Sequence, residues 1–373
     1  MIPYGHHWID DDDISAVETV LRSEWLTTGP NVLNFEKALE ITVGAPCVAV
    51  SSGTAALDCA FASLGIRPGD EIITPPLTFI ATQATAFLQG AKIVFADVLP
   101  ETGAINPAHV ENLITSRTIA IVAVDYAGQP AEYDELRFIA EKYGLILIDD
   151  AAHSIGSIYK GRKIGEISDL TTFSFFPTKN ITTGEGGAIA SNNVELLEKV
   201  RLYGRQGMVK DSKRFKLNPE GDWHQEVHDF GLNYRLPDIL CALGLSQLRK
   251  LEQAKDLKQD IFNRYKNAFS GIDELKLLET RSYNSVNWHL FPLRVDKNVK
   301  SHVFKALREA SIGVQVNYIP AYWHPAFKDI GYSQGLCPEA ENFYAEEISL
   351  PIHPKLSDAD VDYVIEKVLS VIK

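Results

Sequence analysis

Two neighbouring stretches, LILIDDAAHSIGS (residues 145–157) and LTTFSFFPTKNITTGEGGAIASN (170–192), decide the fold of this 373-residue chain. Each begins as an apolar strand and continues into polar residues, the aspartates Asp149 and Asp150 in the first and a turn that contains Lys179 in the second. Burial lowers the pKa of a lysine, and its amine can then form a Schiff base with a cofactor. Taken alone, however, a lysine in a glycine-rich turn is more typical of a protein surface.

Strand-like and helical patterns alternate along the first half of the chain. Buried strands are predicted at 47–52, 71–74, 92–98, 118–124 and 145–148, and helices near 54–64, 78–88, 107–113 and 132–143. This alternation predicts an α/β fold with a mainly parallel sheet and helices on both faces, in which a ligand crevice lies beyond the carboxyl ends of the strands. The residues at those ends are Ser52, Thr74, Asp125, Asp149, Asp150 and Phe176.

The pattern changes after Pro237, where a long helical stretch (238–269) resembles a connector. Beyond it, the segments at 286–295, 303–310, 314–318 and 358–372 predict a smaller α+β domain. We therefore predict a large domain at 1–250, which includes an N-terminal arm, and a small C-terminal domain at 251–373.

Composition argues against several classes of function. The formal net charge of −13 leaves no basic stripe for nucleic acid. The four cysteines form no C-x-x-C pair, and the adjacent His6 and His7 lack further ligands at metal spacing, so no metal site is expected. With no secretory leader and no apolar run of ~18 residues, we expect a cytoplasmic protein without a membrane span.

Four features at the predicted sheet edge suit a phosphorylated ring cofactor. The turn Ser51–Thr54 could bind an anion at a helix N-terminus, although a helix cap is the alternative. One strand-end aspartate could keep a pyridine nitrogen protonated, or both could be solvated. Phe79 could stack on the ring or pack in the core. Together with Lys179, in this chain order, they are typical of pyridoxal phosphate (PLP) enzymes with the aspartate aminotransferase fold.

Longer segments closely resemble the DegT-type nucleotide-sugar aminotransferase family. They are SSGTAALDCAF (51–61), TFIATQAT (78–85), the run 148–189 and GLNYRLPDILCALGLSQL (231–248). The resemblance covers nearly the whole chain. It implies the aspartate aminotransferase-like PLP fold (fold type I), with a mainly parallel seven-stranded sheet between helices in the large domain.

The resemblance also implies roles for single residues. Lys179 would form the Schiff base with PLP, and Asp150 would pair with the pyridine nitrogen. The other implied cofactor residues are Ser52, Gly53, Thr54 and Ser174 at the phosphate, and Phe79 and His153 next to the ring. Asn233, in the N-Y-R-L motif, would contact the phosphate of the neighbouring subunit's cofactor, which implies an obligate homodimer with shared active sites. Without the resemblance, Asn233 reads as a helix cap.

The expected reaction is transamination, because Lys179 is present where a dehydrating branch of the family has histidine. L-Glutamate would convert PLP to pyridoxamine phosphate, which would then aminate a ketosugar, while Lys179 moves the proton. The motifs VDYAGQ (124–129), GLNYRL (231–236) and VNYIPAY (316–322) most resemble the branch that makes UDP-4-amino-4,6-dideoxy-N-acetyl-β-L-altrosamine from a UDP-linked 4-keto-6-deoxy-N-acetylhexosamine in pseudaminic acid synthesis. Many relatives have H-x-Y-G where this chain has DYAG (125–128), which favours the same branch.

Aromatic and histidine side chains suit contacts to a sugar and a uracil ring, although each could equally serve packing. The candidate substrate residues are Tyr4, His6, Trp25, Thr27, Gln129, His289, Tyr318 and His324. Two alternatives stay open: an aminotransferase for a dTDP- or GDP-linked ketosugar or for a 3-ketosugar, and a PLP-binding regulator without catalytic activity. The acidic charge and the lack of an attached DNA-binding segment weigh against the regulator.

Overall fold

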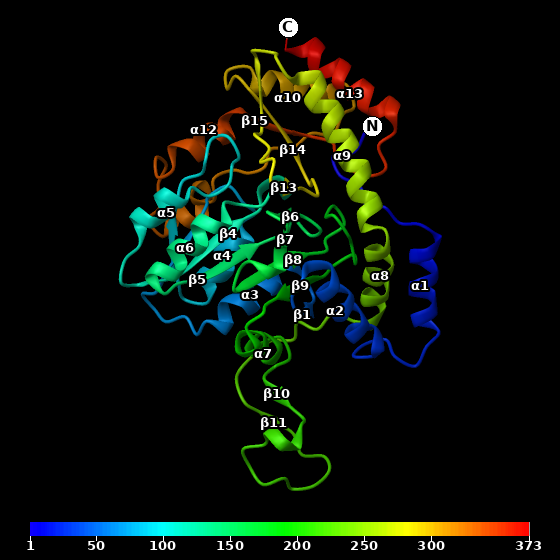
Figure 1. Cartoon of the computed structure of the whole chain (residues 1–373), viewed down its shortest axis with the longest axis vertical. Helices are drawn as coiled ribbons and strands as arrows, with labels where there is room; N and C mark the ends of the chain where they lie inside the picture. The colour runs from blue at the N-terminus through cyan, green and yellow to red at the C-terminus, as the bar shows by residue number, and fades with distance from the viewer. Residues whose placement is uncertain (373) are drawn as a thin grey trace.

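A seven-stranded sheet in the order β1-β9-β8-β5-β4-β2-β3 forms the centre of the molecule (Figure 1). The computed structural model describes residues 1–372. The strands are β1 (Cys47–Val50), β2 (Glu71–Thr74), β3 (Lys92–Phe95), β4 (Thr118–Val124), β5 (Ile146–Asp150), β8 (Leu170–Ser174) and β9 (Gly187–Ala190). Only β9 is antiparallel to its neighbours, β1 and β8. The predicted mainly parallel seven-stranded sheet is confirmed.

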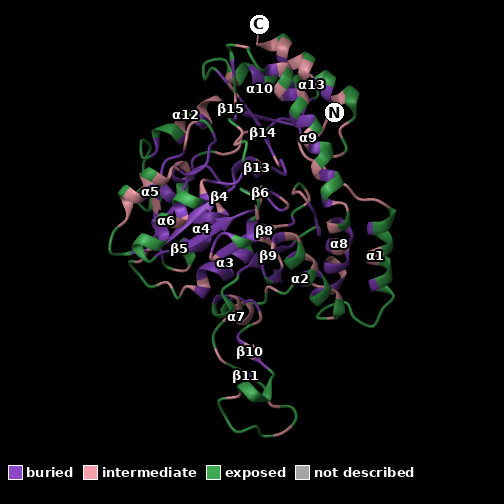
Figure 2. Ribbon diagram, viewed as in Figure 1, coloured by how far each residue is buried: buried purple, intermediate pink, exposed green. Residues whose placement is uncertain are grey.

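Helices cover both faces of the sheet, and Figure 2 shows the strands of this sheet as buried. They are α2 (Pro30–Val43), α3 (Gly53–Ser63), α4 (Ala81–Leu88), α5 (Pro107–Leu113), α6 (Tyr133–Tyr143), α7 (Val194–Tyr203) and α8 (Asp238–Arg249). Side chains of β4 alternate between two apolar clusters: Ala120 and Val122 pack into one, and Ile121 and Ala123 into the other. Burial on both sides explains why β4 reads as a continuous apolar run.

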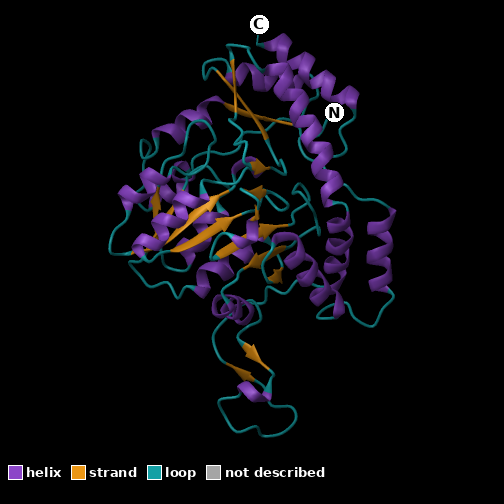
Figure 3. Ribbon diagram, viewed as in Figure 1, coloured by secondary structure: helices purple, strands orange, loops and turns teal. Residues whose placement is uncertain are grey.

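The C-terminal half contains a second, antiparallel sheet of three strands (Figure 3). Its strands are β12 (Leu275–Leu277), β14 (Phe291–Val295) and β15 (Glu347–Leu350), and the helices around it are α9 (Leu251–Phe269), α10 (Lys300–Glu309), α11 (Pro325–Asp329), α12 (Pro338–Glu346) and α13 (Asp358–Val371). The predicted long helix is two helices, α8 and α9, separated at Lys250. The division into two domains at that point stays a prediction.

Some predicted segments differ from the structure. The strands predicted at 47–52 and 92–98 end at Val50 and Phe95, and within the segment 286–295 a strand begins only at Phe291. The segment 314–318 is not a strand: it makes a single bridge, between Gln315 and Ser349. Its polar main-chain groups are instead bound by side chains from other parts of the chain, such as Glu347, which accepts from the N–H of Asn317.

Smaller elements lie around this framework. They are α1 (Asp11–Leu21), the short strands β6 (Ile158–Tyr159), β7 (Arg162–Lys163), β10 (Met208–Val209), β11 (Glu226–Val227) and β13 (Asn284–Ser285), and the 3₁₀ turns η1 (Tyr126–Gly128), η2 (Ile164–Glu166), η3 (Ser212–Arg214) and η4 (Ala321–Trp323). Strands β10 and β11 form a hairpin that protrudes from the molecule (Figure 1). Among residues 1–372, none of the helices combines the length and apolar character needed to cross a membrane.

Candidate active site

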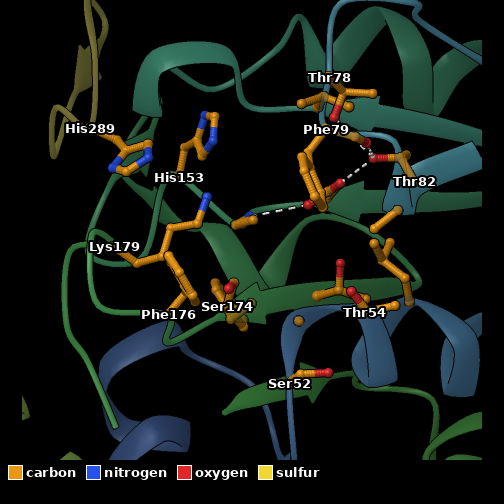
Figure 4. Close-up of a pocket in the computed structure, with 18 of the residues that line it drawn as sticks. Ser52, Thr54, Thr78, Phe79, Thr82, His153, Ser174, Phe176, Lys179 and His289 are labelled. Atoms are coloured by element: carbon orange, nitrogen blue, oxygen red, sulfur yellow. Dashed lines mark hydrogen bonds between the residues drawn. The ribbon is translucent and has the colours of Figure 1, made fainter. Parts of the chain in front are cut away.

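A cavity of about 450 Å³ opens at the carboxyl ends of the parallel strands (Figure 4). Its walls come from the N-terminal segment, the starts of α3 and α4, the ends of β5 and β8, and the C-terminal half. Of the residues singled out from the sequence, it brings together Tyr4, Ser52, Gly53, Thr54, Phe79, Asp150, His153, Ser174, Lys179, His289 and Tyr318. The cavity therefore lies where the strand pattern predicted a ligand crevice.

Lys179 lies in a turn that follows β8. Its main-chain N–H donates to the carbonyl of Phe176 at 2.9 Å, and its side chain points into the cavity toward His153 (Figure 4). Burial lowers the pKa of Lys179 to about 8, although the nearby carboxyl of Asp150 opposes this shift. Near neutral pH a fraction of the amine is therefore uncharged, which is the form that attacks a carbonyl carbon.

Asp150 is the last residue of β5, and its carboxyl lines the cavity. Oδ2 accepts from Thr82 Oγ1 at 2.6 Å, and Oδ1 accepts from the N–H of Ala152 at 3.3 Å. Burial raises the pKa of Asp150, while the bond from Thr82 and the charge of Lys179 lower it. Asp149, one residue earlier on the strand, does not line the cavity. The two aspartates thus point to opposite faces, as strand geometry requires.

The start of α3 forms the opposite end of the cavity. Ser52 is the N-cap of α3, and its Oγ accepts from the N–H of Ala55 at 3.0 Å. The Ser52 side chain is therefore a helix cap. A Cβ on Gly53 would lie 2.7 Å from Cβ of Ser174, so only glycine fits there. The first N–H groups of a helix lack intrahelical partners, and its dipole favours an anion at this end.

Two histidines and a tyrosine form a further wall. His153 Nε2 lies 3.1 Å from the hydroxyl of Tyr318, and the ring centroids of His153 and His289 are 4.2 Å apart. Burial lowers the pKa of both histidines well below the ordinary value, with smaller contributions from neighbouring positive charges that include Lys179. Both rings are therefore uncharged at neutral pH. Within residues 1–372, His153 Nδ1 is buried without a hydrogen-bond partner.

Several predicted substrate residues lie outside this cavity: His6, Trp25, Thr27, Gln129 and His324. In Gln129, Nε2 donates to the carbonyl of Glu279 at 3.0 Å and Oε1 accepts from the N–H of Arg281 at 2.9 Å, so its role at the substrate stays a prediction. The buried amide joins two segments and is not turned toward a ligand. Trp25 and Thr27 are exposed, and His324 caps α11. Asn233 is also exposed and outside the cavity.

The chain matches the sequence profile of the DegT/DnrJ/EryC1/StrS aminotransferase family over residues 7–369. It belongs to this family. It is 40% identical over 380 residues to the spore coat polysaccharide biosynthesis protein SpsC of Bacillus subtilis, covering 100% of this chain and 97% of that protein. It is 37% identical over 381 residues to the UDP-4-amino-4,6-dideoxy-N-acetyl-β-L-altrosamine transaminase of Campylobacter jejuni, covering 100% and 98%.

Solved structures agree with this membership. The putative sugar aminotransferase Spr1654 of Streptococcus pneumoniae, in its PMP form, superimposes with a TM-score of 0.94 at 31% identity, covering 100% of this chain and 99% of that chain. PseC of Helicobacter pylori, an aminotransferase involved in pseudoaminic acid biosynthesis, gives 0.94 at 32%, with the same coverage. The protein is thus a PLP-dependent sugar aminotransferase with the aspartate aminotransferase-like fold, as predicted.

The cavity of this aminotransferase fits PLP. The glycine at the start of α3 leaves room for a phosphate at free N–H groups, Asp150 offers a carboxyl deep in the cavity, and the orphaned His153 Nδ1 leaves a polar atom for a bound group. Sequence reasoning missed Thr82, which holds Asp150. Its signal is the i, i+4 pair Thr78 and Thr82 in TFIATQAT, whose hydroxyls lie 2.9 Å apart. Thr78 lies before α4, so this contact joins the turn that leads into the helix to its first turn.

Proposed function

We propose that this enzyme transfers the amino group of L-glutamate to the 4-keto group of a UDP-linked 4-keto-6-deoxy-N-acetylhexosamine. The product would be UDP-4-amino-4,6-dideoxy-N-acetyl-β-L-altrosamine. The C. jejuni relative, which carries this product in its name, supports the proposal through 37% identity over the whole chain, and PseC supports it through the fold. The observation that carries the chemistry is the Lys179 side chain in the cavity, opposite the start of α3 and near enough to the Asp150 carboxyl to interact electrostatically with it.

In this proposal, Lys179 binds PLP covalently, Asp150 pairs with the ring nitrogen, and Gly53, Thr54 and Ser174 hold the phosphate. When bound, PLP supplies an electron sink that stabilises negative charge on the substrate carbon. The geometry supports the assignment because the amine and the helix N-terminus lie at opposite ends of one cavity (Figure 4). Phe79 and His153 line the space between them and would contact the ring.

Lys179 would also move the proton. With a pKa of about 8, its free amine can take a proton from the substrate carbon and return it to the neighbouring atom at neutral pH. Asp150, whose carboxyl accepts a hydrogen bond from Thr82, would pair with the ring nitrogen and keep it protonated. The uncharged His289 and the hydroxyl of Tyr318 can hydrogen-bond to sugar oxygens without adding charge to the site.

We also propose that the active enzyme is a homodimer with shared sites. Asn233 follows the hairpin of β10 and β11 in the sequence, and it is exposed and outside the cavity of its own chain. Phe230 and Leu232 beside it are 92% and 47% exposed, a large apolar area for a monomer to leave in water. A second subunit that covers this surface could receive Asn233 at the phosphate of its own cofactor.

A substrate panel tests the sugar assignment. Purified enzyme is incubated with L-glutamate and, in turn, the UDP-linked N-acetyl-4-keto sugar and its dTDP- and GDP-linked counterparts, and amino-sugar formation is measured by mass spectrometry. The proposal predicts turnover of the UDP-linked N-acetyl-4-keto sugar in preference to the others. Turnover of only the dTDP- or GDP-linked sugars would show that the substrate assignment is wrong.

A covalent-attachment experiment tests the role of Lys179 separately. Borohydride reduction of the PLP-loaded enzyme, followed by peptide mass spectrometry, is expected to find the cofactor on Lys179. Lys179→Ala should lose turnover and attachment while keeping its circular dichroism spectrum. Full activity in this variant, or a cofactor attached to another lysine, would refute the assigned role.

A further inference from the structure

Asn180, which follows Lys179, connects three separate parts of the structure through its amide. Nδ2 donates to the carbonyl oxygens of His153 at 2.8 Å and of Asn287 at 3.0 Å. Oδ1 accepts from Nζ of Lys258 at 2.7 Å. These partners lie in the loop after β5, the loop before β14 and helix α9. Every polar atom of the amide is therefore bound.

The two carbonyl groups belong to the segments that present the histidines of the cavity. One is that of His153 itself, and Asn287 lies two residues before His289. The rings of these two histidines are 4.2 Å apart and line the same cavity as Lys179. The Asn180 amide thus sets where Lys179 lies relative to both rings.

Lys258, the third partner, is an unusual residue for its position on α9. It is 3% exposed, and within residues 1–372 Nζ makes no ion pair and only one hydrogen bond, the one to Asn180. Burial lowers its pKa to about 7, and the charge of Lys255 contributes further. Because a buried amine without an acidic partner is costly, an apolar side chain of similar volume would favour stability more. Stability alone therefore does not explain a lysine here.

We propose that Lys258 is a positioning residue that acts on Lys179 through Asn180. The Asn180 amide has a donor end and an acceptor end, and both carbonyl groups require the donor end. Nζ of Lys258 donates to the acceptor end of the amide and so fixes that orientation. If the amide were rotated by half a turn, Oδ1 would face the two carbonyl oxygens and Nδ2 would face Lys258. The role rests on the proposed function of Lys179, and it links α9 to the turn that carries this lysine.

Lys258→Met tests the proposal, because methionine has a similar length and no donor. We expect kcat for amino transfer from L-glutamate to fall roughly 10- to 100-fold, since small displacements of a reacting group are costly, with a smaller change in KM. In the cofactor-free protein, amide hydrogen exchange over residues 176–184 should become faster. The melting temperature should change little, because removal of a buried amine is offset by the unpaired Oδ1 that it leaves on Asn180.

Lys255→Met is the matched control. Lys255 lies one turn earlier on the same helix, and its Nζ binds a carbonyl oxygen, that of Gly156, at 2.9 Å without touching Asn180. This variant should keep kcat, and the hydrogen-exchange rates of residues 176–184, within about twofold of wild type. The reason is that Lys255 has no contact with Asn180, and substitutions without a shared partner act independently. A loss equal to that of Lys258→Met would overturn the proposal.

The double variant tests the route through Asn180. If Lys258 acts through that amide, Lys258→Met adds no further loss of kcat to Asn180→Ala. Losses that multiply, or wild-type kcat in Asn180→Ala, would overturn the proposal even if Lys258→Met does not fold. Exchange in the cofactor-free protein is independent of catalysis, so unchanged exchange counts against this proposal. A wild-type enzyme inactive on every ketosugar counts instead against the proposed function.

Discussion

Thr82→Val is expected to weaken catalysis by removing the hydroxyl that holds Asp150, while keeping the shape of the side chain. The Thr82 hydroxyl donates to Oδ2 at 2.6 Å and lowers a pKa that burial raises. A hydrogen bond to a charged group contributes about 1.5–3 kcal/mol, which corresponds to roughly 10- to 100-fold in the population of the carboxylate or in rate. In the variant, Asp150 therefore takes up a proton at a higher pH than in wild type. Once protonated, it no longer offers a carboxylate to the ring nitrogen.

The assay is the half-reaction of the PLP-loaded enzyme with L-glutamate, followed by the visible absorbance of the bound cofactor across a range of pH. We expect Thr82→Val to lower kcat/KM by roughly 10- to 100-fold at neutral pH. The acidic limb of the profile should move to higher pH. Thr82→Ser keeps the donor and should behave like wild type. A valine variant within about twofold of wild type, with an unmoved acidic limb, would refute the reasoning.

Three further predictions follow from the structure. Mixing Lys179→Ala with Asn233→Ala subunits should restore about a quarter of wild-type activity, because about half of the dimers are then hybrids with one intact site each; no recovery would contradict shared sites. Burial raises the pKa of Glu347 from 4.5 to about 8, so the folded cofactor-free protein holds a proton that the unfolded chain releases, and urea unfolding should show stability falling as pH rises through this window. Glu347→Gln should reduce that slope by up to about 1.4 kcal/mol per pH unit, and an unchanged slope would exclude this residue as its source. Gln129→Ala should lower the free energy of unfolding by about 1–3 kcal/mol with KM for the sugar unchanged, whereas a raised KM at wild-type stability would restore Gln129 to the substrate site.

The parallel sheet was predictable because its strands are buried on both faces. β2 and β4 begin and end at the predicted residues, since a doubly covered strand is apolar along its whole length. β9 was not found from its own pattern, because Gly187–Ala190 contains only small residues and isoleucine. Its place between β1 and β8 follows from its neighbours, which no local pattern reveals.

Contacts between distant segments explain the other differences. The helical pattern runs through Lys250, yet the helix ends there, and Nζ of Lys250 binds Asp10 at 2.6 Å and Asp13 at 2.5 Å. Likewise, nothing within VDYAGQ shows that Glu279 and Arg281 bind both ends of the amide of its glutamine. In each case the deciding partner is far along the sequence.

Residues of the cavity were predictable where chemistry and strand ends coincide, as for Asp150 and Lys179. Their supporting groups were not, because Thr82 and Lys258 are ordinary residues until the fold brings a carboxyl or an amide to them. Sequence identifies a reactive group by its type. It does not identify the side chain that fixes that group in place.

One wall of the cavity joins segments that are far apart in the sequence. The hydroxyl of Tyr4 donates to Asn317 Oδ1 at 2.7 Å, and the N–H of Asn317 donates to Glu347 Oε2 at 2.8 Å. During translation, residue 4 emerges long before residues 317 and 347, so this wall cannot form until those residues have been made. A nascent chain can therefore form much of its central sheet before the cavity is complete.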